Sequence, residues 1–318
     1  MLQEMLQQIS PLDSAAMETA RQHWDAIAKP LHSLGRLEDL VVQLAGITGT
    51  ANLPPRKKAV LIFCADNGVV AEGVTQTTQA VTAAVTRNFT KGIASVNALS
   101  RVCGADVFPV DIGVAEELHC DGIISRKIAA GYNLIITGEM GIGNTTTSSA
   151  VFSVLQQLPP KQVTGRGAGL SGAGLRHKVE VIAKAIALHQ PDRNDVLDVL
   201  SKVGGLDICG MAGAFLGGAV YHVPVLIDGF ISAVAANCAV RLAPLCRQYL
   251  FASHCSREPA GKLALEALGL RAYLDCDMCL GEGTGGVIGA KLFDFALAAY
   301  GEIAGFDAVG IAPYEKLQ

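Results

Sequence analysis

Two glycine-rich loops of this chain each have a glutamate where the backbone turns. The first reads Gly-Glu-Met-Gly-Ile-Gly-Asn-Thr-Thr-Thr over residues 138–147, and the second reads Gly-Glu-Gly-Thr-Gly-Gly over residues 281–286. Glycine lets a backbone approach a ligand closely and turn its N–H groups toward an anion. Because a carboxylate repels phosphate, Glu139 and Glu282 indicate chemistry on the sugar or base of a nucleotide whose phosphate binds nearby.

The first loop lies between an apolar run and a helical stretch at 148–157. Amides at a helix N-terminus, together with threonine hydroxyls, form an anion cradle. The loop matches neither Gly-x-x-x-x-Gly-Lys-Ser/Thr nor Gly-x-Gly-x-x-Gly, and no lysine follows to neutralise a triphosphate. It therefore predicts a monophosphate site, with an ordinary helix cap as the alternative.

A third glycine loop, at 165–174, adds basic residues. Arg166 lies within it, and Arg176 and Lys178 follow. Basic groups beside glycine amides suit a phosphate or a carboxylate, although a solvated helix start has the same pattern. Glu282 is flanked by two glycines, so burial would raise its pKa and make it a candidate general base. An exposed acidic turn is the alternative.

Other reaction classes lack their signatures. The chain has no nucleophile elbow and no catalytic triad motif of the Ser/His/Asp kind. A monophosphate site with a carboxylate base fits glycosyl exchange at a nucleotide. A pyridinium nucleotide suits this reaction because its base leaves neutral without a general acid. The incoming base then needs only a carboxylate to remove its ring proton.

The elements that must position these loops form an α/β pattern. Short apolar runs at 59–65, 105–110, 133–137, 223–227 and 249–252 alternate with helical stretches. This predicts a parallel, Rossmann-like sheet with helices on both faces. Pro109 and Pro224 each remove a ladder donor, so their strands are expected at edges or with bulges.

Polar side chains follow nearly every run, and carboxyl ends of parallel strands meet at one edge of a sheet. We expect Asp66, Asp111, Glu139, Asp228 and His254 along this rim, although aspartate and glycine also favour plain turns.

Helices are predicted at 15–29, 34–45 and 288–303. The predicted domains are a small helical one, from 1–50 with 288–318, and a large α/β one at 51–287.

Composition supports a compact α/β enzyme. The 318 residues are 50% hydrophobic and 17% charged, with a net charge of −4 and no basic run for nucleic acid. The apolar stretch 208–227 has the length of a membrane span, but four glycines and Pro224 favour a buried helix at 208–220 and a buried strand. We expect no membrane partner.

Nine cysteines, an odd number in a chain without a signal peptide, predict reduced thiols and a cytoplasmic location. Cys276 and Cys279 form a Cys-x-x-Cys pair. No second pair completes a zinc site, and the pair does not open a helix of a thioredoxin-like unit. We therefore expect inert packing rather than metal or redox chemistry.

In order along residues 34 to about 300, the motifs resemble the nicotinate-nucleotide–dimethylbenzimidazole phosphoribosyltransferase family of cobalamin lower-ligand assembly. The matching segments are 66–69, 72–74, 138–146, 165–167, 204–208, 228–230 and 280–285. The resemblance implies transfer of phosphoribose from nicotinate mononucleotide to 5,6-dimethylbenzimidazole, giving α-ribazole 5'-phosphate and nicotinate. A non-catalytic nucleotide-binding homologue and a nucleotide hydrolase are the alternatives.

The resemblance also implies a homodimer whose site is partly covered by the neighbouring subunit. We expect no cofactor and no metal, because glycine amides and helix N-termini can hold a single phosphate. Glu282 corresponds to the general base, beside Gly281. Lys178 and Asp207 would lie near the reacting centre, and Thr77 and Val85 belong to the acceptor wall at 74–85. This wall lacks the proline and polar side chain of many members, so the acceptor base stays open. The remaining residues would hold the ribose phosphate: Glu139, Gly141, Gly143, Asn144, Thr145, Gly165, Arg166, Gly167 and Ser256.

Overall fold

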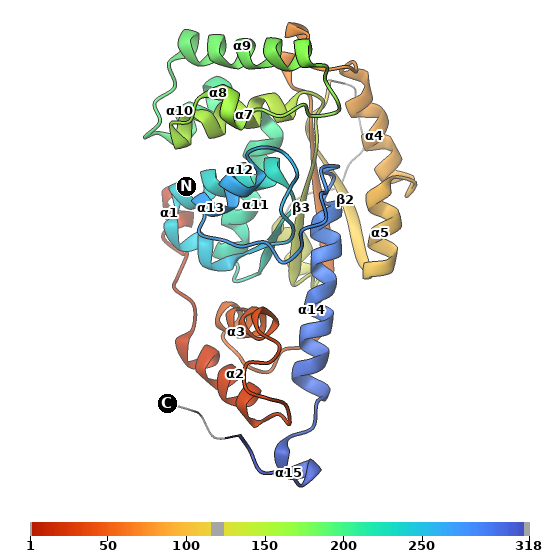
Figure 1. Cartoon of the computed structure of the whole chain (residues 1–318), viewed down its shortest axis with the longest axis vertical. Coiled ribbons are helices and arrows are strands. Elements are labelled where there is room, and N and C mark those ends of the chain that lie inside the picture. Colours follow the sequence, from red (N-terminus) through yellow and green to blue (C-terminus); the bar gives the residue numbers. More distant parts are fainter. Residues whose placement is uncertain (1, 116–123, 315–318) are drawn as a thin grey trace.

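The computed structural model describes residues 2–115 and 124–314, and its centre is a five-stranded sheet. All neighbouring strands pair in parallel, in the order β2-β1-β3-β4-β5 (Figure 1). The predicted α/β class with a parallel sheet is confirmed. The strands are β1 Lys58–Ala65, β2 Ala105–Gly113, β3 Leu134–Met140, β4 Val225–Ile227 and β5 Leu250–Ala252.

The two central strands β1 and β3 are buried at every position, as expected of apolar strands covered on both faces. Pro109 lies on β2, an edge strand, as predicted. The prediction for Pro224 was wrong, because β4 is an inner strand. Pro224 immediately precedes β4, where it needs no donor, and its carbonyl accepts a hydrogen bond from the Ile135 amide at 3.1 Å.

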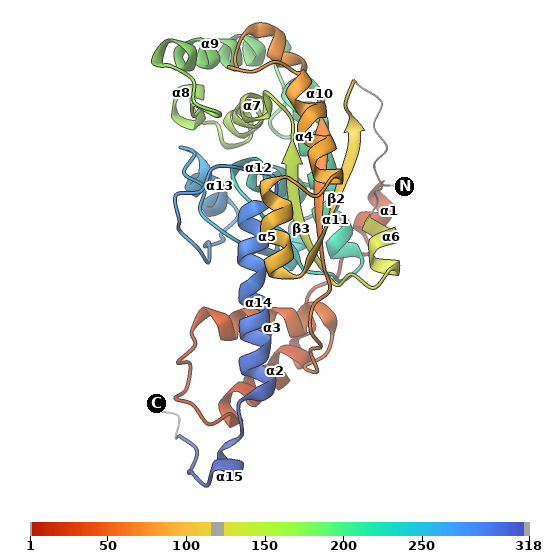
Figure 2. The ribbon, with the colours of Figure 1, turned by 90° about the vertical axis from the view of Figure 1, so that its right-hand side faces the viewer.

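Helices cover both faces of the sheet (Figures 1 and 2). One face packs against α11 (Leu206–Val220) and α12 (Phe230–Leu242), and the other against α4 (Ala80–Thr90), α5 (Ser95–Cys103) and the start of α14 (Thr284–Glu302). The buried helix expected at 208–220 is therefore confirmed as α11. Among the described helices, none has the length and apolar character to cross a membrane.

The N-terminal helices are α1 (Leu2–Leu6), α2 (Ser14–Ala26) and α3 (Arg36–Thr48). Helix α2 ends before Pro30 is reached, because Ile27 is extended and bridges Gly305. Helix α14 runs without a break from the sheet to α3 (Figure 2), so it crosses residue 288. The proposed division into two domains at 50 and 288 stays a prediction.

The remaining helices connect these elements. They are η1 Gly68–Glu72, α6 Ile124–Ala129, α7 Asn144–Gln156, α8 Pro160–Val163, α9 Gly172–His189, α10 Val196–Val203, η2 Pro244–Tyr249, α13 Gly261–Ala267 and α15 Phe306–Val309. Helix α7 begins within the first glutamate loop, at Asn144, and α14 begins within the second, at Thr284. Two helix N-termini therefore lie at the carboxyl edge of the sheet.

Candidate active site

A cavity of about 260 Å³ lies at this carboxyl edge. Its walls come from all three glycine loops, from the turns after β4 and β5, and from residues 74–77. The structure therefore brings together segments that are far apart in the sequence. The predicted site residues that line the cavity are Thr77, Glu139, Gly141, Gly143, Asn144, Thr145, Arg166, Gly167, Lys178, Ser256, Gly281 and Glu282.

Glu282 lies in a tight left-handed turn. It has a φ of 63°, between Gly281 and Gly283 at 84° each, and a left-handed conformation is costly for a residue with a side chain. Asp228 fixes the turn, because its two carboxylate oxygens accept hydrogen bonds from the amides of Gly283 (3.1 Å) and Gly286 (2.8 Å). The strained conformation is therefore held from outside the loop.

The Glu282 carboxylate has the environment of a base. Its Oε2 atom is buried and has no hydrogen-bond partner, and burial raises the pKa of the group. A backbone hydrogen bond from Val96, in the first turn of α5, opposes the shift. A carboxylate that lines a cavity, with a raised pKa and one oxygen without a partner, can accept a proton from a bound ligand.

The two glutamate loops touch each other. A Cβ atom on Gly138 would lie 2.7 Å from the carbonyl carbon of Glu282, so only glycine at this position of β3 allows the approach. Glu139 therefore comes next to the Glu282 turn, where the charge of Glu282 contributes to the raised pKa of Glu139. The two glutamates singled out from the sequence belong to one site.

Glu139 shares a buried amide with Asp207. The Asn144 side chain donates hydrogen bonds to Glu139 Oε2 and, at 2.9 Å, to Asp207 Oδ2. Burial, with the charge of Asp207 next, raises the pKa of Glu139 to about 8, and burial raises that of Asp207 to about 6. Glu139 is therefore largely protonated at neutral pH. Asp207 is fully buried behind Asn144 and does not line the cavity.

Lys178 is a buried cationic residue of the cavity wall. Its side chain is buried, and Nζ donates to the Thr145 hydroxyl at 2.7 Å. A Cβ atom on Gly167 would lie 3.5 Å from the same Nζ, so the ammonium group lies between two glycine loops. Burial lowers the pKa of Lys178 to about 8, opposed by the charge of Glu258. A bound anion would stabilise the charged form of the Lys178 ammonium group.

Two predicted phosphate ligands take other positions. Arg166 lines the cavity, but its Nη1 atom donates to the Leu170 carbonyl at 2.6 Å, within its own loop. Gly165 does not line the cavity and packs against the Glu258 carboxylate. Glu258 is a cavity residue that the sequence reasoning missed. The signal was available, since a polar turn at 253–258 follows β5 at the same edge.

The predicted rim residues separate into two groups. Asp228 and His254 line the cavity with Glu139, and His254 Nδ1 lies 3.9 Å from Asp228 Oδ1. Asp66 and Asp111 instead hold turns. Asp66 accepts from the Ala115 amide at 2.8 Å, and Asp111 accepts from the amides of Gly113 and Val114. The contacts of Asp66 and Asp111 are therefore those of ordinary turn residues, the alternative given for them from the sequence.

The predicted acceptor wall is only partly in contact with the cavity. Val74, Thr75, Gln76 and Thr77 line it, and the Gln76 side chain donates to the Gly169 carbonyl of the second loop. Val85 lies within α4, half-buried against the core, and does not line the cavity. Apolar contributions that the sequence reasoning did not name come from Phe230 and Leu280.

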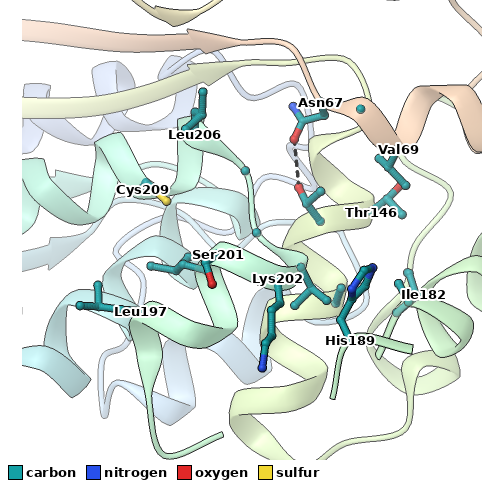
Figure 3. Close-up of a pocket in the computed structure, with 18 of the residues that line it drawn as sticks. Asn67, Val69, Thr146, Ile182, His189, Leu197, Ser201, Lys202, Leu206 and Cys209 are labelled. Atoms are coloured by element: carbon teal, nitrogen blue, oxygen red, sulfur yellow. Dashed lines mark hydrogen bonds between the residues drawn. The ribbon is translucent and has the colours of Figure 1, made fainter. Parts of the chain in front are cut away.

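A larger cavity of about 860 Å³ lies on the other side of the α7 N-terminus (Figure 3). Leu197, Ile182 and Leu206 are among its mainly apolar walls, and Thr147 donates to Asn67 at its border at 3.3 Å. Of the residues predicted from the sequence, Asp66 of the rim lines it, but none of the predicted catalytic and substrate-binding residues does. We place the active site in the smaller cavity, because the buried carboxylates and the buried lysine converge there.

Comparison with known proteins identifies the family of the chain. A family model described as "Phosphoribosyltransferase" matches residues 9–131 and 120–311. The chain belongs to this family. It is 44% identical to the nicotinate-nucleotide–dimethylbenzimidazole phosphoribosyltransferase of Acetivibrio thermocellus, over 99% of each chain. It is 42% identical to the Clostridium acetobutylicum enzyme of the same name, over 100% of this chain and 99% of the relative.

Solved structures of the phosphoribosyltransferase family have the same fold. A crystal structure of CobT from Thermus thermophilus aligns with a TM-score of 0.89 and 35% identity, covering 94% of this chain and 100% of that chain. A second structure of the nicotinate-nucleotide–dimethylbenzimidazole phosphoribosyltransferase from that organism gives 0.87 and 35%, covering 95% and 99%. The resemblance seen in the motifs is thus confirmed.

Proposed function

We propose that the chain transfers the phosphoribosyl group of nicotinate mononucleotide to 5,6-dimethylbenzimidazole or a related base. The products are α-ribazole 5'-phosphate and nicotinate, in assembly of the cobalamin nucleotide loop. Membership of the family supports this activity. The observation that carries it in the structure is the buried Glu282 carboxylate, with one unpaired oxygen, in the same cavity as Lys178.

The cavity offers one end for the phosphate and one for the base. Lys178, the Thr145 hydroxyl and the Gly167 loop form a cationic end that suits a monophosphate. Glu282, with the apolar Leu280 and Val74 also in the wall, forms the other end. There Glu282 removes the ring proton of the incoming base. Attack opposite the departing nicotinate inverts the anomeric centre from β to α.

Glu139 is assigned a different role from Glu282. Because its pKa is about 8, it is largely a neutral acid at pH 7, and a neutral acid repels neither phosphate nor Glu282. Held by Asn144, it can donate a hydrogen bond to a ribose oxygen. Asp207 positions Asn144 from behind and does not contact the substrate.

One assay separates this function from its alternatives. The protein is incubated with nicotinate mononucleotide, with and without dimethylbenzimidazole, and nicotinate and α-ribazole phosphate are quantified. Transfer that depends on the base supports the proposal. Nicotinate release without the base indicates a hydrolase, and no release with either indicates a non-catalytic homologue.

We also infer that the chain is a cytoplasmic homodimer. Exposed apolar side chains lie on the neighbouring helices α5 and α14, including Val102 (79% exposed) and Phe295 (59% exposed), and a second copy would cover them. The cysteines of the described residues are free thiols, which is typical of proteins in a reducing compartment. Sedimentation velocity over a range of concentrations tests the dimer, and cell fractionation tests the location.

A further inference from the structure

The Cys276–Cys279 pair lies in the segment that leads into the Glu282 turn. Residue 274 bridges His254 beside the last strand, and Gly281 begins the left-handed turn seven residues later. Both thiols are exposed. The expectation that they are packed in the interior was therefore wrong, whereas their expected inertness stays a prediction.

Cys279 is itself part of the active-site wall. It lines the same cavity as Leu280, Gly281 and Glu282. Arg257 holds it through two contacts: its Nη2 atom donates to Cys279 Sγ at 3.3 Å, and its backbone amide donates to the Met278 carbonyl at 3.0 Å. The sulfur thus has a cationic group on one side and the substrate cavity on the other.

The backbone between the two cysteines is already bent. The chain bends at Cys276, and Asp277 has a left-handed φ of 53°. A disulfide spans Cα atoms about 4.4–6.8 Å apart. Cys276 and Cys279 are three positions apart across this bend, so forming the bond requires the bend to bring their Cα atoms into that range.

We propose that Cys276 and Cys279 form a thiol–disulfide switch that controls the position of Glu282. The Cys279 thiolate attacks a small-molecule disulfide and releases one thiol. The Cys276 thiolate then attacks the Cys279 sulfur and releases the second thiol. Two protein thiols are oxidised by two electrons, and the small disulfide is reduced to two thiols.

Closing the bond removes the Arg257–Cys279 contact and pulls on the segment 276–280. Because Glu282 is two residues beyond Leu280, its carboxylate moves relative to the bound base. Misplacement by about 1 Å can lower a rate by about 10²-fold. The effect on activity rests on the proposed function, whereas formation of the disulfide does not. A dithiol reductant restores the open form.

Cys255 is a matched control within the same region. It is half-buried, its amide donates to the Leu274 carbonyl at 2.9 Å, and it does not line the cavity. Burial raises the pKa of its thiol, so it reacts more slowly as a nucleophile. A Cys255→Ser variant should therefore behave as the unaltered chain does in every measurement below.

The test treats the full chain with glutathione disulfide, removes the excess, and measures thiols, peptide masses and transfer rate. We expect a Cys276–Cys279 disulfide with no added mass, and a rate at least about tenfold lower that a dithiol restores. Cys276→Ser, with the untreated rate unchanged, should trap one glutathione on Cys279. That adduct identifies Cys279 as the attacking sulfur and Cys276 as the resolving one.

Three results would overturn the switch: a stable glutathione adduct on the unaltered chain, a disulfide elsewhere, or full activity with the Cys276–Cys279 bond formed. If the untreated protein performs no transfer, the proposed function fails separately. The switch is then judged on the disulfide itself and on calorimetric binding of dimethylbenzimidazole, which oxidation must weaken.

Discussion

At the scale of single residues, the two glutamates differ because their surroundings differ. Glu282 has one buried oxygen without a partner, whereas the pKa of Glu139 is raised by its burial and by the charge of Asp207, which outweigh the opposing hydrogen bond from Asn144. The first environment favours a group that takes a proton, and the second favours one that keeps it. The division into a base and a neutral acid follows from these contacts.

Glu282→Gln keeps the size of the side chain but cannot accept the ring proton. Turnover with dimethylbenzimidazole should fall by roughly 10²–10⁴ while nicotinate mononucleotide still binds. Steady-state rates and calorimetric titration of the nucleotide measure the two effects. An unchanged thermal melt is the control for folding, and a near-normal rate would remove Glu282 from its role.

The raised pKa of Glu139 predicts how stability depends on pH. The folded chain keeps this proton up to about pH 8, whereas the ordinary value of the unfolded chain is 4.5. Between these values the folded state binds more protons, so the free energy of unfolding falls as pH rises. We expect Glu139→Gln to flatten this fall between pH 5 and 8. Denaturant unfolding across that range checks it, and equal slopes for both proteins would contradict the shift.

Both glutamates could be found from the sequence, because each lies within a cluster of glycines. Such a cluster indicates that the backbone comes close to a ligand or to another segment. The link from Asn144 to Asp207 could not be found, since it depends on two segments 63 residues apart meeting in space. The hydrogen bond from Arg166 to the Leu170 carbonyl could not be predicted either, because no local pattern indicates it, and the role of Arg166 as a phosphate ligand stays a prediction.

At the scale of elements, the N-terminus of α14 shows a tertiary contact overriding local sequence. Gly285 and Gly286 are poor helix formers, so the sequence predicted a start at residue 288. The helix begins at Thr284 because Asp228 accepts from the amides of Gly283 and Gly286. The element and the catalytic turn are therefore fixed by the same carboxylate.

Replacing Asp228 should destabilise both the N-terminus of α14 and the turn that holds Glu282. Asp228→Ala leaves two buried amides without acceptors, which costs about 1–3 kcal/mol for such a group, and it frees the Glu282 turn. We expect a lower free energy of unfolding together with a lower turnover. Asp228→Asn is the matched variant, since it retains one acceptor oxygen and should lose less of each. Chemical denaturation and initial rates give both quantities, and a stable but inactive Asp228→Ala protein would mean that Asp228 does not cap α14.

At the scale of the whole molecule, the sheet is less well covered at the edge formed by β2. The alignment with the A. thermocellus relative runs over 348 positions, 30 more than this chain has residues. The two matches to the family model meet at 120–131, within the connection from β2 to β3. In the described part of that connection the one helix is α6, of six residues. We infer that the extra length of the relatives falls here.

Strand β2 is therefore an edge strand with little protection from solvent. Only Pro109 of β2 is buried, whereas every residue of β1 is. Local opening is easiest where few apolar contacts cover a strand. We therefore expect the β2 amides that pair with β1 to exchange hydrogen at a lower opening free energy than those joining β1 to β3. Native-state hydrogen exchange at residue resolution measures both sets in one sample, with β3 as the internal reference. Equal protection of the two ladders would show that β2 is covered by something else, and a second copy of the chain would then be the first candidate, tested by repeating the exchange at lower protein concentration.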